Sequence, residues 1–311
     1  MKVLVTGGAG FIGSHVADAF VAAGHEVWAL DDLSTGQREN VGPGVRLVVA
    51  DIGAPESARL VETERFEILC HLAAQMDVRR SVADPRFDAT VNIGGFLNLL
   101  EAARKVPVRK VVFSSTGGAI YGDQDVYPAP ETHPTRPVSP YGVSKASGEL
   151  YLGYYRAQYG LNSVALRYAN VYGPRQDPHG EAGVVAIFCG RLLDRQRCTI
   201  FGDGRQTRDY TYVGDVVRAN LYALTSKASG LALNIGTGRE TSVNELYTAL
   251  AQVAGETQPA QYAEARPGEQ LRSVISPRRA AAELGWKPEV ELAEGLDRTF
   301  SYFRDARARG R

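Results

Sequence analysis

Six short apolar segments in the first 170 residues constrain the fold of this 311-residue chain more than any other feature. Each is rich in β-branched and aliphatic residues, and longer helical patterns lie between them. Strands that are apolar nearly throughout are expected to be covered on both faces, as in parallel sheets. The alternation therefore predicts an α/β fold with an open, doubly wound parallel sheet and right-handed crossovers. The predicted strands are residues 2–6, 26–30, 45–50, 67–72, 109–115 and 163–168.

The regular alternation ends near residue 170. The segment "NVYGPRQDPHGEAG" is rich in glycine, proline and charged residues, and the later elements follow no simple order. We therefore predict a larger domain over residues 1–170 and a smaller, ligand-covering domain over residues 171–311. Two later segments, "VGDVVRANLYAL" and "ALNIGTG", are expected to return to the large sheet.

Charge and cysteine content narrow the classes of partner. Lys+Arg and Asp+Glu residues number 35 each, so no global charge favours nucleic acid or an anionic membrane. No run of about 18 apolar residues is present that could span a bilayer. Cys70, Cys189 and Cys198 match no metal or redox spacing, which predicts no bound metal and a reducing, cytoplasmic environment.

A glycine-rich turn follows the first predicted strand. The segment "VTGGAGFIGS" contains Gly8-x-Gly10-x-x-Gly13, or equally Gly7-x-x-Gly10-x-x-Gly13, directly before a helical pattern. Glycines there permit a tight turn and a close approach of the backbone to a pyrophosphate, which the free N–H groups of the helix start can bind. The turn therefore predicts a dinucleotide site.

The second predicted strand ends in two acidic residues, Asp31 and Asp32. Asp31 lies at the spacing expected for the residue that accepts from a ribose 2′-OH. A carboxylate there repels the 2′-phosphate of NADP, so the pattern favours NAD. The alternative interpretation is that the two carboxylates only cap a loop, and the preceding glycine turn argues against it.

Five side chains form a candidate reactive centre at the carboxyl edge of the sheet. Ser114, Ser115 and Thr116 end the fifth predicted strand, and "SPYGVSK" begins a helix that carries Tyr141 and Lys145 one turn apart. An ammonium near a phenol favours the phenolate and lowers the phenol pKa, and a positive nicotinamide ring adds to this effect. We therefore predict Tyr141 as a general base and acid that Lys145 tunes toward neutral pH.

The assembled motifs resemble those of the extended short-chain dehydrogenase/reductase family, whose fold is Rossmann-like. The resemblance is carried by "TGGAGFIG", "DD", "ADI", "HLAAQ", "FSSTGGAIYG", "YGVSK" and "LRYANVYGP". It extends along nearly the whole chain, because "FGDGRQTRDYTYVGDVV" and "ARPGEQLRSVISPRRAAAELGWKP" resemble the family's nucleotide-sugar-binding half. It implies NAD as the cofactor and a smaller C-terminal α/β domain that binds the substrate.

The resemblance also implies which residues contact the cofactor. They lie in the glycine turn, at the strand ends that follow it, and beside the reactive centre. The predicted NAD contacts are Gly7, Gly10, Phe11, Ile12, Gly13, Asp31, Asp32, Leu33, Asp51, Ile52, Leu72, Ala73, Ala74, Gln75, Asn92, Ser114, Tyr141, Lys145 and Tyr168.

The family contains several chemistries that begin with oxidation at C4 of a nucleotide sugar. Relatives that eliminate water or carbon dioxide carry an acidic residue directly after the hydroxyl that follows strand five, whereas here Thr116 is followed by Gly117 and Gly118. Without that carboxylate, the expected outcome is return of the hydride to the opposite face, a 4-epimerisation. Thr116 is the expected hydroxyl at the sugar 4-oxygen, but the spacing leaves Ser115 as an alternative.

The resemblance places the substrate, a UDP-sugar, against later segments. Asn170 is expected to contact the diphosphate or sugar, and Arg208 and Arg266 are expected to clamp the phosphates. Glu269 is expected to accept from the uridine ribose. Ser273 stands where some relatives have a bulky tyrosine, which predicts a roomier sugar pocket that admits N-acetylated sugars.

Three alternatives remain open at this level. The substrate could be UDP-N-acetylglucosamine or UDP-glucuronate, the chain could be a 4-keto-sugar reductase, or it could sense NAD without turnover. Sensors of this fold commonly lack the Tyr-x-x-x-Lys pair, which this chain has. Helical stretches 91–105 and 144–159 resemble those through which the family forms homodimers, so a homodimer is expected.

Overall fold

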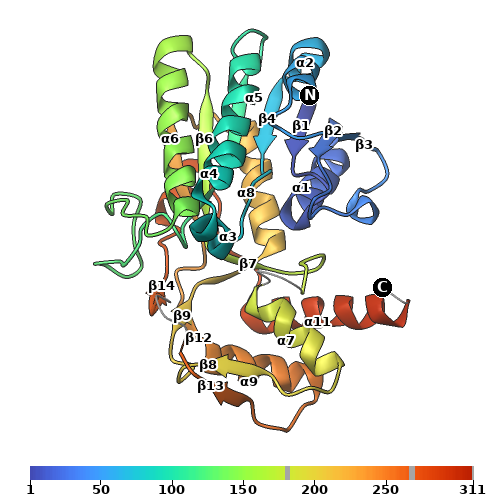
Figure 1. The fold of residues 1–311 in the computed structure, drawn as a ribbon, viewed down its shortest axis with the longest axis vertical. Coiled ribbons are helices and arrows are strands. Elements are labelled where there is room, and N and C mark those ends of the chain that lie inside the picture. The colour runs from blue at the N-terminus through green and yellow to red at the C-terminus, as the bar shows by residue number, and fades with distance from the viewer. Residues whose placement is uncertain (179–182, 266–269, 310–311) are drawn as a thin grey trace.

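The computed structural model describes residues 1–178, 183–265 and 270–309. Seven parallel strands form its main sheet, in the order β3-β2-β1-β4-β5-β6-β11 (Figure 1). All six predicted strands and the doubly wound parallel architecture are confirmed. The strands are β1 (Lys2–Thr6), β2 (Glu26–Asp31), β3 (Val45–Val49), β4 (Ile68–His71), β5 (Lys110–Thr116), β6 (Ser163–Tyr168) and β11 (Leu231–Ile235).

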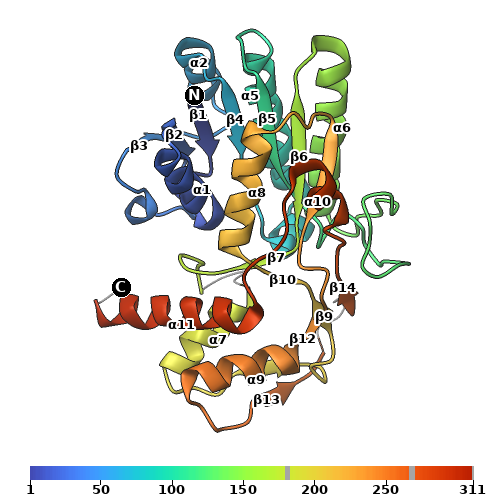
Figure 2. The ribbon, with the colours of Figure 1, turned by 180° about the vertical axis from the view of Figure 1, so that it is seen from behind.

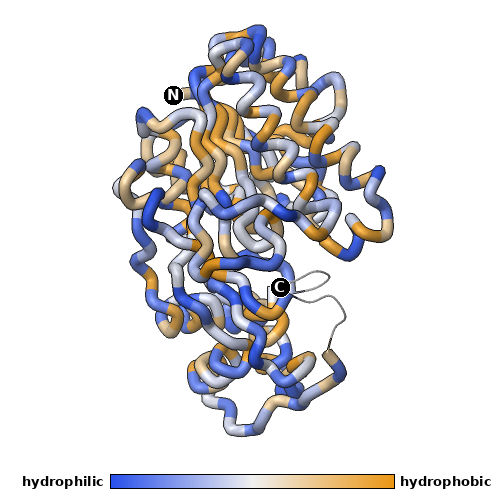
Figure 3. The backbone as a smooth tube through the Cα atoms, turned by 90° about the vertical axis from the view of Figure 1, so that its left-hand side faces the viewer, coloured by the Kyte–Doolittle hydropathy of each residue, from blue (hydrophilic) through white to orange (hydrophobic). Residues whose placement is uncertain are grey.

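Helices cover both faces of the sheet, as strands that are apolar throughout require. One face packs against α2 (Pro55–Glu64), α5 (Phe96–Ala103) and α6 (Pro140–Tyr159). The opposite face packs against α1 (Phe11–Ala22), α8 (Val213–Thr225) and α10 (Arg278–Leu284), as Figure 2 shows from behind. The strands between these layers form the apolar centre of the upper lobe in Figure 3.

The strand order places a topological switch point between β1 and β4. The chain runs outward from β1 through β2 to β3, then crosses back to β4 on the other side of β1. Thr6 at the end of β1 pairs with His71 at the end of β4. Ligands of open α/β sheets bind outside the carboxyl ends of the strands at such a point.

Three short helices connect β4 to α5. They are α3 (Val78–Ala83), α4 (Pro85–Ala89) and the π-helical turn η2 (Thr90–Gly95), so the predicted helix over 91–105 is regular only in its second half. A side chain would not fit at Gly95, because a Cβ atom there would lie 2.6 Å from Cγ1 of Ile52. The backbone of η2 therefore approaches the end of β3 closely.

A second lobe lies beyond the carboxyl edge of the sheet, below it in Figure 1. Its apolar core joins three helices to short strands. The helices are α7 (Val184–Leu193), α9 (Val243–Ala254) and α11 (Leu292–Ala308). The strands are β7 (Asn170–Tyr172), β8 (Thr199–Phe201), β9 (Thr207–Arg208), β10 (Tyr210–Tyr212), β12 (Thr241–Ser242), β13 (Gln261–Ala263) and β14 (Arg272–Ser273). A single 3₁₀ turn, η1 (Arg38–Asn40), precedes β3.

Several later elements belong to the large sheet. The strand β11 pairs with β6, and α8 and α10 pack on the same face as α1. We therefore propose a division near residue 170 in which α8, β11 and α10 are assigned to the large lobe and the other later elements to the small lobe. Within the described ranges, no helix has the length and apolar character needed to cross a membrane.

Candidate functional site

The glycine turn between β1 and α1 has little room for side chains. Gly7 has a φ of +69° and donates its N–H to the carbonyl of Leu30 at 2.8 Å. A Cβ atom at Gly7 would lie 2.8 Å from the backbone nitrogen of Ala73, and one at Gly13 would lie 2.0 Å from the Gly7 oxygen. Gly10 occupies the N-cap of α1 and makes no side-chain capping bond. The first N–H groups of the helix therefore stay available to a ligand. This arrangement fits a pyrophosphate held by backbone donors.

Asp31 lies against this turn. Its carboxylate accepts from the backbone N–H of Ala9 at 3.0 Å and of Leu33 at 2.9 Å. Burial raises the pKa of Asp31, and the two backbone donors oppose that effect. Asp32 differs, because it is exposed and folds back onto the N–H and hydroxyl of Ser34. Asp31 therefore fits the predicted ribose contact better than Asp32, which caps the following loop.

The ends of β3 and β4 supply the next predicted cofactor contacts. Asp51 is exposed and accepts from the N–H of Gly53 at 2.7 Å, whereas Ile52 is buried. Leu72, Ala73 and Ala74 follow β4 and are partly buried. These residues lie along one sheet edge beside the glycine turn, where a dinucleotide would extend across the switch point.

The three hydroxyls at the end of β5 have different surroundings. Ser114 is partly buried, and its carbonyl accepts from the ammonium of Lys145 at 2.8 Å. Ser115 is buried and donates to Oε1 of Glu149 at 2.5 Å. Glu149 in turn forms a buried ion pair with Arg167 at 2.6 Å. Ser115 is therefore part of a structural polar network.

Thr116 is the hydroxyl that remains available. Its Oγ1 accepts from the N–H of Ala119 at 3.2 Å, which leaves its own proton free to donate elsewhere. A Cβ atom built on Gly118 would lie 3.9 Å from Oγ1 of Thr116 and 3.7 Å from Oδ1 of Asn170. The two predicted substrate contacts Thr116 and Asn170 thus flank the same glycine.

The helix α6 brings Tyr141 and Lys145 to the end of β5. Its N-cap is Ser139, whose side chain accepts from the N–H of Gly142, and Pro140 occupies the first turn. Lys145 is buried, donates to the carbonyl of Ser114 at 2.8 Å, and lies 5.9 Å from the Tyr141 ring centroid. A Cβ atom on Gly142 would lie 2.6 Å from the Ala119 oxygen, so the start of the helix packs on the loop that follows Thr116.

Burial acts on the ionisation of both members of the pair. Burial lowers the pKa of Lys145 to about 8, although the carboxylate of Asp88 opposes that effect. Burial also raises the pKa of Tyr141, and Asp88 raises it further. Burial and Asp88 thus oppose the predicted lowering of the Tyr141 pKa by Lys145 and the nicotinamide ring, and that lowering stays a prediction.

Asp88 is a site residue that the sequence analysis missed. It is fully buried, and it accepts from Ser144 at 2.6 Å, Asn92 at 3.0 Å and Gln75 at 3.2 Å. Asn92 also exchanges hydrogen bonds with the backbone of Gln75. The side chains of Asn92 and Gln75 thus shape the loop after β4, and their direct contact with a cofactor stays a prediction. No periodic or motif signal in the sequence distinguishes Asp88 from the exposed acids around it.

The predicted substrate contacts of the small lobe converge on β9 and β14. Ser273 is buried and pairs in register with Arg208, which is partly buried. The N–H of Asn170 donates to the Asp209 carbonyl at 2.9 Å, next to Arg208. Arg266 and Glu269 lie outside the described residues, so their roles stay predictions.

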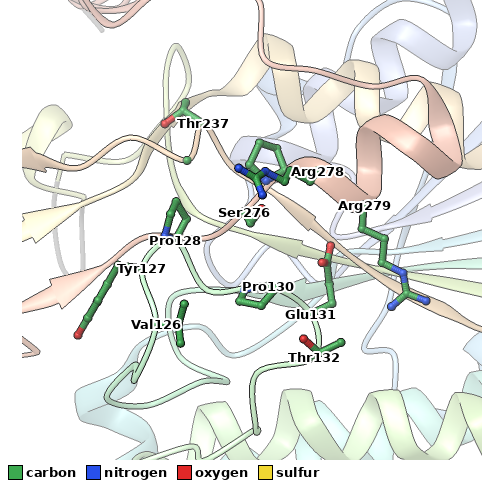
Figure 4. A pocket seen from close by; sticks show the side chains of 12 residues that line it. Val126, Tyr127, Pro128, Pro130, Glu131, Thr132, Thr237, Ser276, Arg278 and Arg279 are labelled. Atoms are coloured by element: carbon green, nitrogen blue, oxygen red, sulfur yellow. The ribbon is translucent and has the colours of Figure 1, made fainter.

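Two surface hollows contain none of the predicted site residues. One, of about 470 Å³, lies on α6 between Ser147, Leu150, Tyr151 and Tyr154. The other, of about 810 Å³, separates the loop of residues 126–132 from the start of α10, and Figure 4 shows Glu131 and the two arginines that line it. The predicted site instead follows the carboxyl edge of the sheet between the lobes.

Comparisons with known proteins agree with this geometry. Residues 3–236 match the model of the NAD dependent epimerase/dehydratase family. A UDP-glucose 4-epimerase from Mycolicibacterium smegmatis is 48% identical over 310 residues, covering 98% of this chain and 99% of that protein.

Two crystal structures extend the similarity to three dimensions. UDP-glucose 4-epimerase from Thermotoga maritima, solved with UDP-glucose, is 48% identical with a TM-score of 0.96, covering 98% of this chain and 99% of that chain. UDP-glucose 4-epimerase from Thermus thermophilus, in complex with NAD, is 49% identical with a TM-score of 0.93, covering 98% of this chain and 100% of that chain.

Proposed function

Since this chain belongs to the NAD-dependent epimerase/dehydratase family, we propose that it interconverts UDP-glucose and UDP-galactose by inverting C4 of the sugar. The observation that carries the proposal is the seating of α6 on the end of β5. Lys145 bonds the Ser114 carbonyl there, which brings Tyr141 to the strand end that carries Thr116. Gly117 and Gly118 follow Thr116, so the strand end offers no carboxylate for elimination.

The residues present fit NAD as the resident cofactor. Gly7, Gly10 and Gly13 leave the backbone open to a pyrophosphate, and Asp31 supplies the ribose acceptor that disfavours a 2′-phosphate. When bound, NAD supplies a reversible hydride acceptor for C4 and a positive ring charge that favours the phenolate of Tyr141.

Residues of the chain carry out proton transfer, stabilise the 4-oxygen and bind the substrate. Tyr141 takes the proton of the sugar 4-OH and later returns it, while Thr116 donates a hydrogen bond to the 4-oxygen of the transient 4-keto sugar. Lys145 holds the start of α6 on β5 and keeps a positive charge near the phenol. Asn170 and Arg208 bind the UDP portion, and the sugar then presents its other face before C4 is reduced.

A direct test uses purified protein and UDP-galactose, with and without added NAD. We expect UDP-glucose to form at the same rate in both samples, because an isomerase regenerates its bound cofactor in every cycle. Separation of the sugar nucleotides and absorbance of reduced cofactor measure the two outcomes. Stoichiometric accumulation of NADH would instead indicate a dehydrogenase, and no conversion in either sample would contradict the proposal.

Ser273 favours a second substrate for the same reaction. Its small side chain is buried where β14 meets β9, next to the proposed diphosphate contact Arg208. We propose that the room left by serine also admits the N-acetyl group of UDP-N-acetylglucosamine. Incubating this sugar nucleotide in the same assay provides the measurement.

We also propose that the protein is a cytoplasmic homodimer. Its three cysteines are free and buried, as expected in a reducing compartment. The outer face of α6 exposes Val143, Leu150, Tyr151 and Tyr154, and Leu150 is 76% exposed. An apolar stripe of this kind on one long helix suits an isologous contact with a second copy.

Leu150→Glu is expected to convert the dimer to a monomer, because two buried carboxylates would face each other across the two-fold axis. Size-exclusion chromatography with light scattering measures the mass. Leu271→Glu is the matched control, since Leu271 is 75% exposed but lies in the small lobe. A Leu150→Glu protein that stays dimeric would place the interface elsewhere.

A further inference from the structure

A buried carboxylate lies next to the reactive pair without a cationic partner of its own. Asp88 is 0% exposed, and within residues 1–178, 183–265 and 270–309 no ion pair joins it to a basic side chain. A buried charge is costly unless hydrogen bonds satisfy it. Three neutral donors from three separate segments converge on it instead.

The shortest of these bonds comes from the reactive helix. Ser144 lies between Tyr141 and Lys145 in sequence, and its hydroxyl donates to Oδ2 of Asp88 at 2.6 Å. Asn92 of η2 and Gln75 of the loop after β4 donate to Oδ1. One carboxylate thus joins α6 to the loop and the π-helical turn that border the dinucleotide site.

We propose that Asp88 is a positioning residue for the proposed epimerisation: its carboxylate fixes the start of α6 through Ser144 and balances the ammonium of Lys145. An amide at this position would reverse the bond to Ser144 and would carry no charge to balance Lys145. The proposal rests on the proposed function, since it assigns Asp88 to the same site.

The titratable groups around Asp88 define the expected effect of removing its charge. Tyr141 and Lys145 face it from α6, and Asp88 raises the pKa of both. His71, at the end of β4, is buried and neutral, because burial and Lys145 lower its pKa well below the usual value. Asp84, at the N-cap of α4, is exposed. Loss of the Asp88 charge therefore moves the ionisations of Tyr141 and Lys145 in one direction, toward lower pH.

The test measures kcat for UDP-galactose against pH in the holoenzyme. Asp88→Asn is expected to move the acidic and the basic limb together by about one pH unit toward lower pH, and to reduce kcat about tenfold at pH 8. Asp84→Asn is the matched control, because it removes an equal but exposed charge and keeps a side chain that caps a helix. Its profile should coincide with that of the unmodified protein.

The variant Ser144→Ala separates the effect of the position of α6 from the effect of the Asp88 charge. It removes the shortest bond to Asp88 but leaves the carboxylate, so kcat should fall several-fold while both limbs keep their pH. Unmoved limbs in folded Asp88→Asn, or an unchanged kcat in Ser144→Ala, would overturn the proposal. If Asp88→Asn does not fold, the kcat of Ser144→Ala tests the positioning role of Asp88 by itself.

A substrate-free measurement keeps the proposal separate from the proposed function. The ultraviolet titration of the Tyr141 phenol, taken as the difference between the unmodified protein and Tyr141→Phe, requires no turnover. With Asp88→Asn the midpoint should again move to lower pH. Failure of the unmodified protein to convert UDP-galactose would contradict the proposed epimerisation. An unmoved midpoint of the phenol titration in Asp88→Asn would contradict the role proposed for Asp88.

Discussion

Replacing Tyr141 with phenylalanine is expected to lower kcat for UDP-galactose about 10³-fold, the loss that follows removal of a general acid–base group. The KM should change little, because the phenol acts mainly on the proton that moves in the transition state. The fold should persist, since phenylalanine keeps the ring and the bonds of Ser139 and Lys145 that seat the start of α6 remain. Initial rates from separated sugar nucleotides, with the NAD content of the purified protein, provide the measurement.

Tyr154→Phe is the matched control for this change. Tyr154 lies on the same helix, and its hydroxyl reaches only that of Tyr159 at 3.4 Å on the surface. Its removal should leave kcat unchanged. If Tyr141→Phe turns over at a rate near that of the unmodified protein, another group must move the proton. If the variant loses NAD, Tyr141 has a role in cofactor binding instead.

Local sequence patterns predict most of the sheet and its cofactor edge. The strands are short apolar runs whose burial on both faces leaves no other arrangement, so their bounds follow closely from composition. Gly13 is equally predictable, because a Cβ atom there would lie 2.0 Å from the oxygen of Gly7 in the same turn. Features fixed by neighbours along the chain are therefore readable from the sequence.

The electrostatics of the reactive pair depends on residues that are distant in sequence. Tyr141 and Lys145 at i, i+4 suggest an ammonium that acts on a phenol in water, but both groups are desolvated and share Asp88 as a neighbour. Asp88 is buried by the crossing of α4 and α6, which no local pattern reveals. The direction of a pKa shift follows from burial, and burial is a property of the assembled fold.

Residues that are distant in sequence also distinguish Ser115 from Thr116. Adjacent residues of a strand point to opposite faces, so one of the two hydroxyls had to face away from the site. The sequence alone does not identify which, because the glycines after Thr116 alter the spacing to "YG". In the structure Glu149 and Arg167 bind Ser115 into a buried network, which favours Thr116 as the hydroxyl at the sugar.

Thr116→Val and Ser115→Ala should consequently have opposite effects. Thr116→Val keeps the shape but removes the donor to the developing charge on the 4-oxygen, so kcat should fall about 10²-fold. It also removes the acceptor of the Ala119 N–H, which should lower the free energy of unfolding by about 1 kcal/mol. Ser115→Ala removes one of the two donors to Oε1 of Glu149, the other being Nε of Arg167. This should lower the free energy of unfolding by about 1–3 kcal/mol while kcat stays within about threefold. Denaturant unfolding and initial rates on both variants measure the contrast. If Ser115→Ala loses turnover and Thr116→Val does not, the roles of the two hydroxyls are reversed, and the Ser115–Glu149 bond must then open during the reaction.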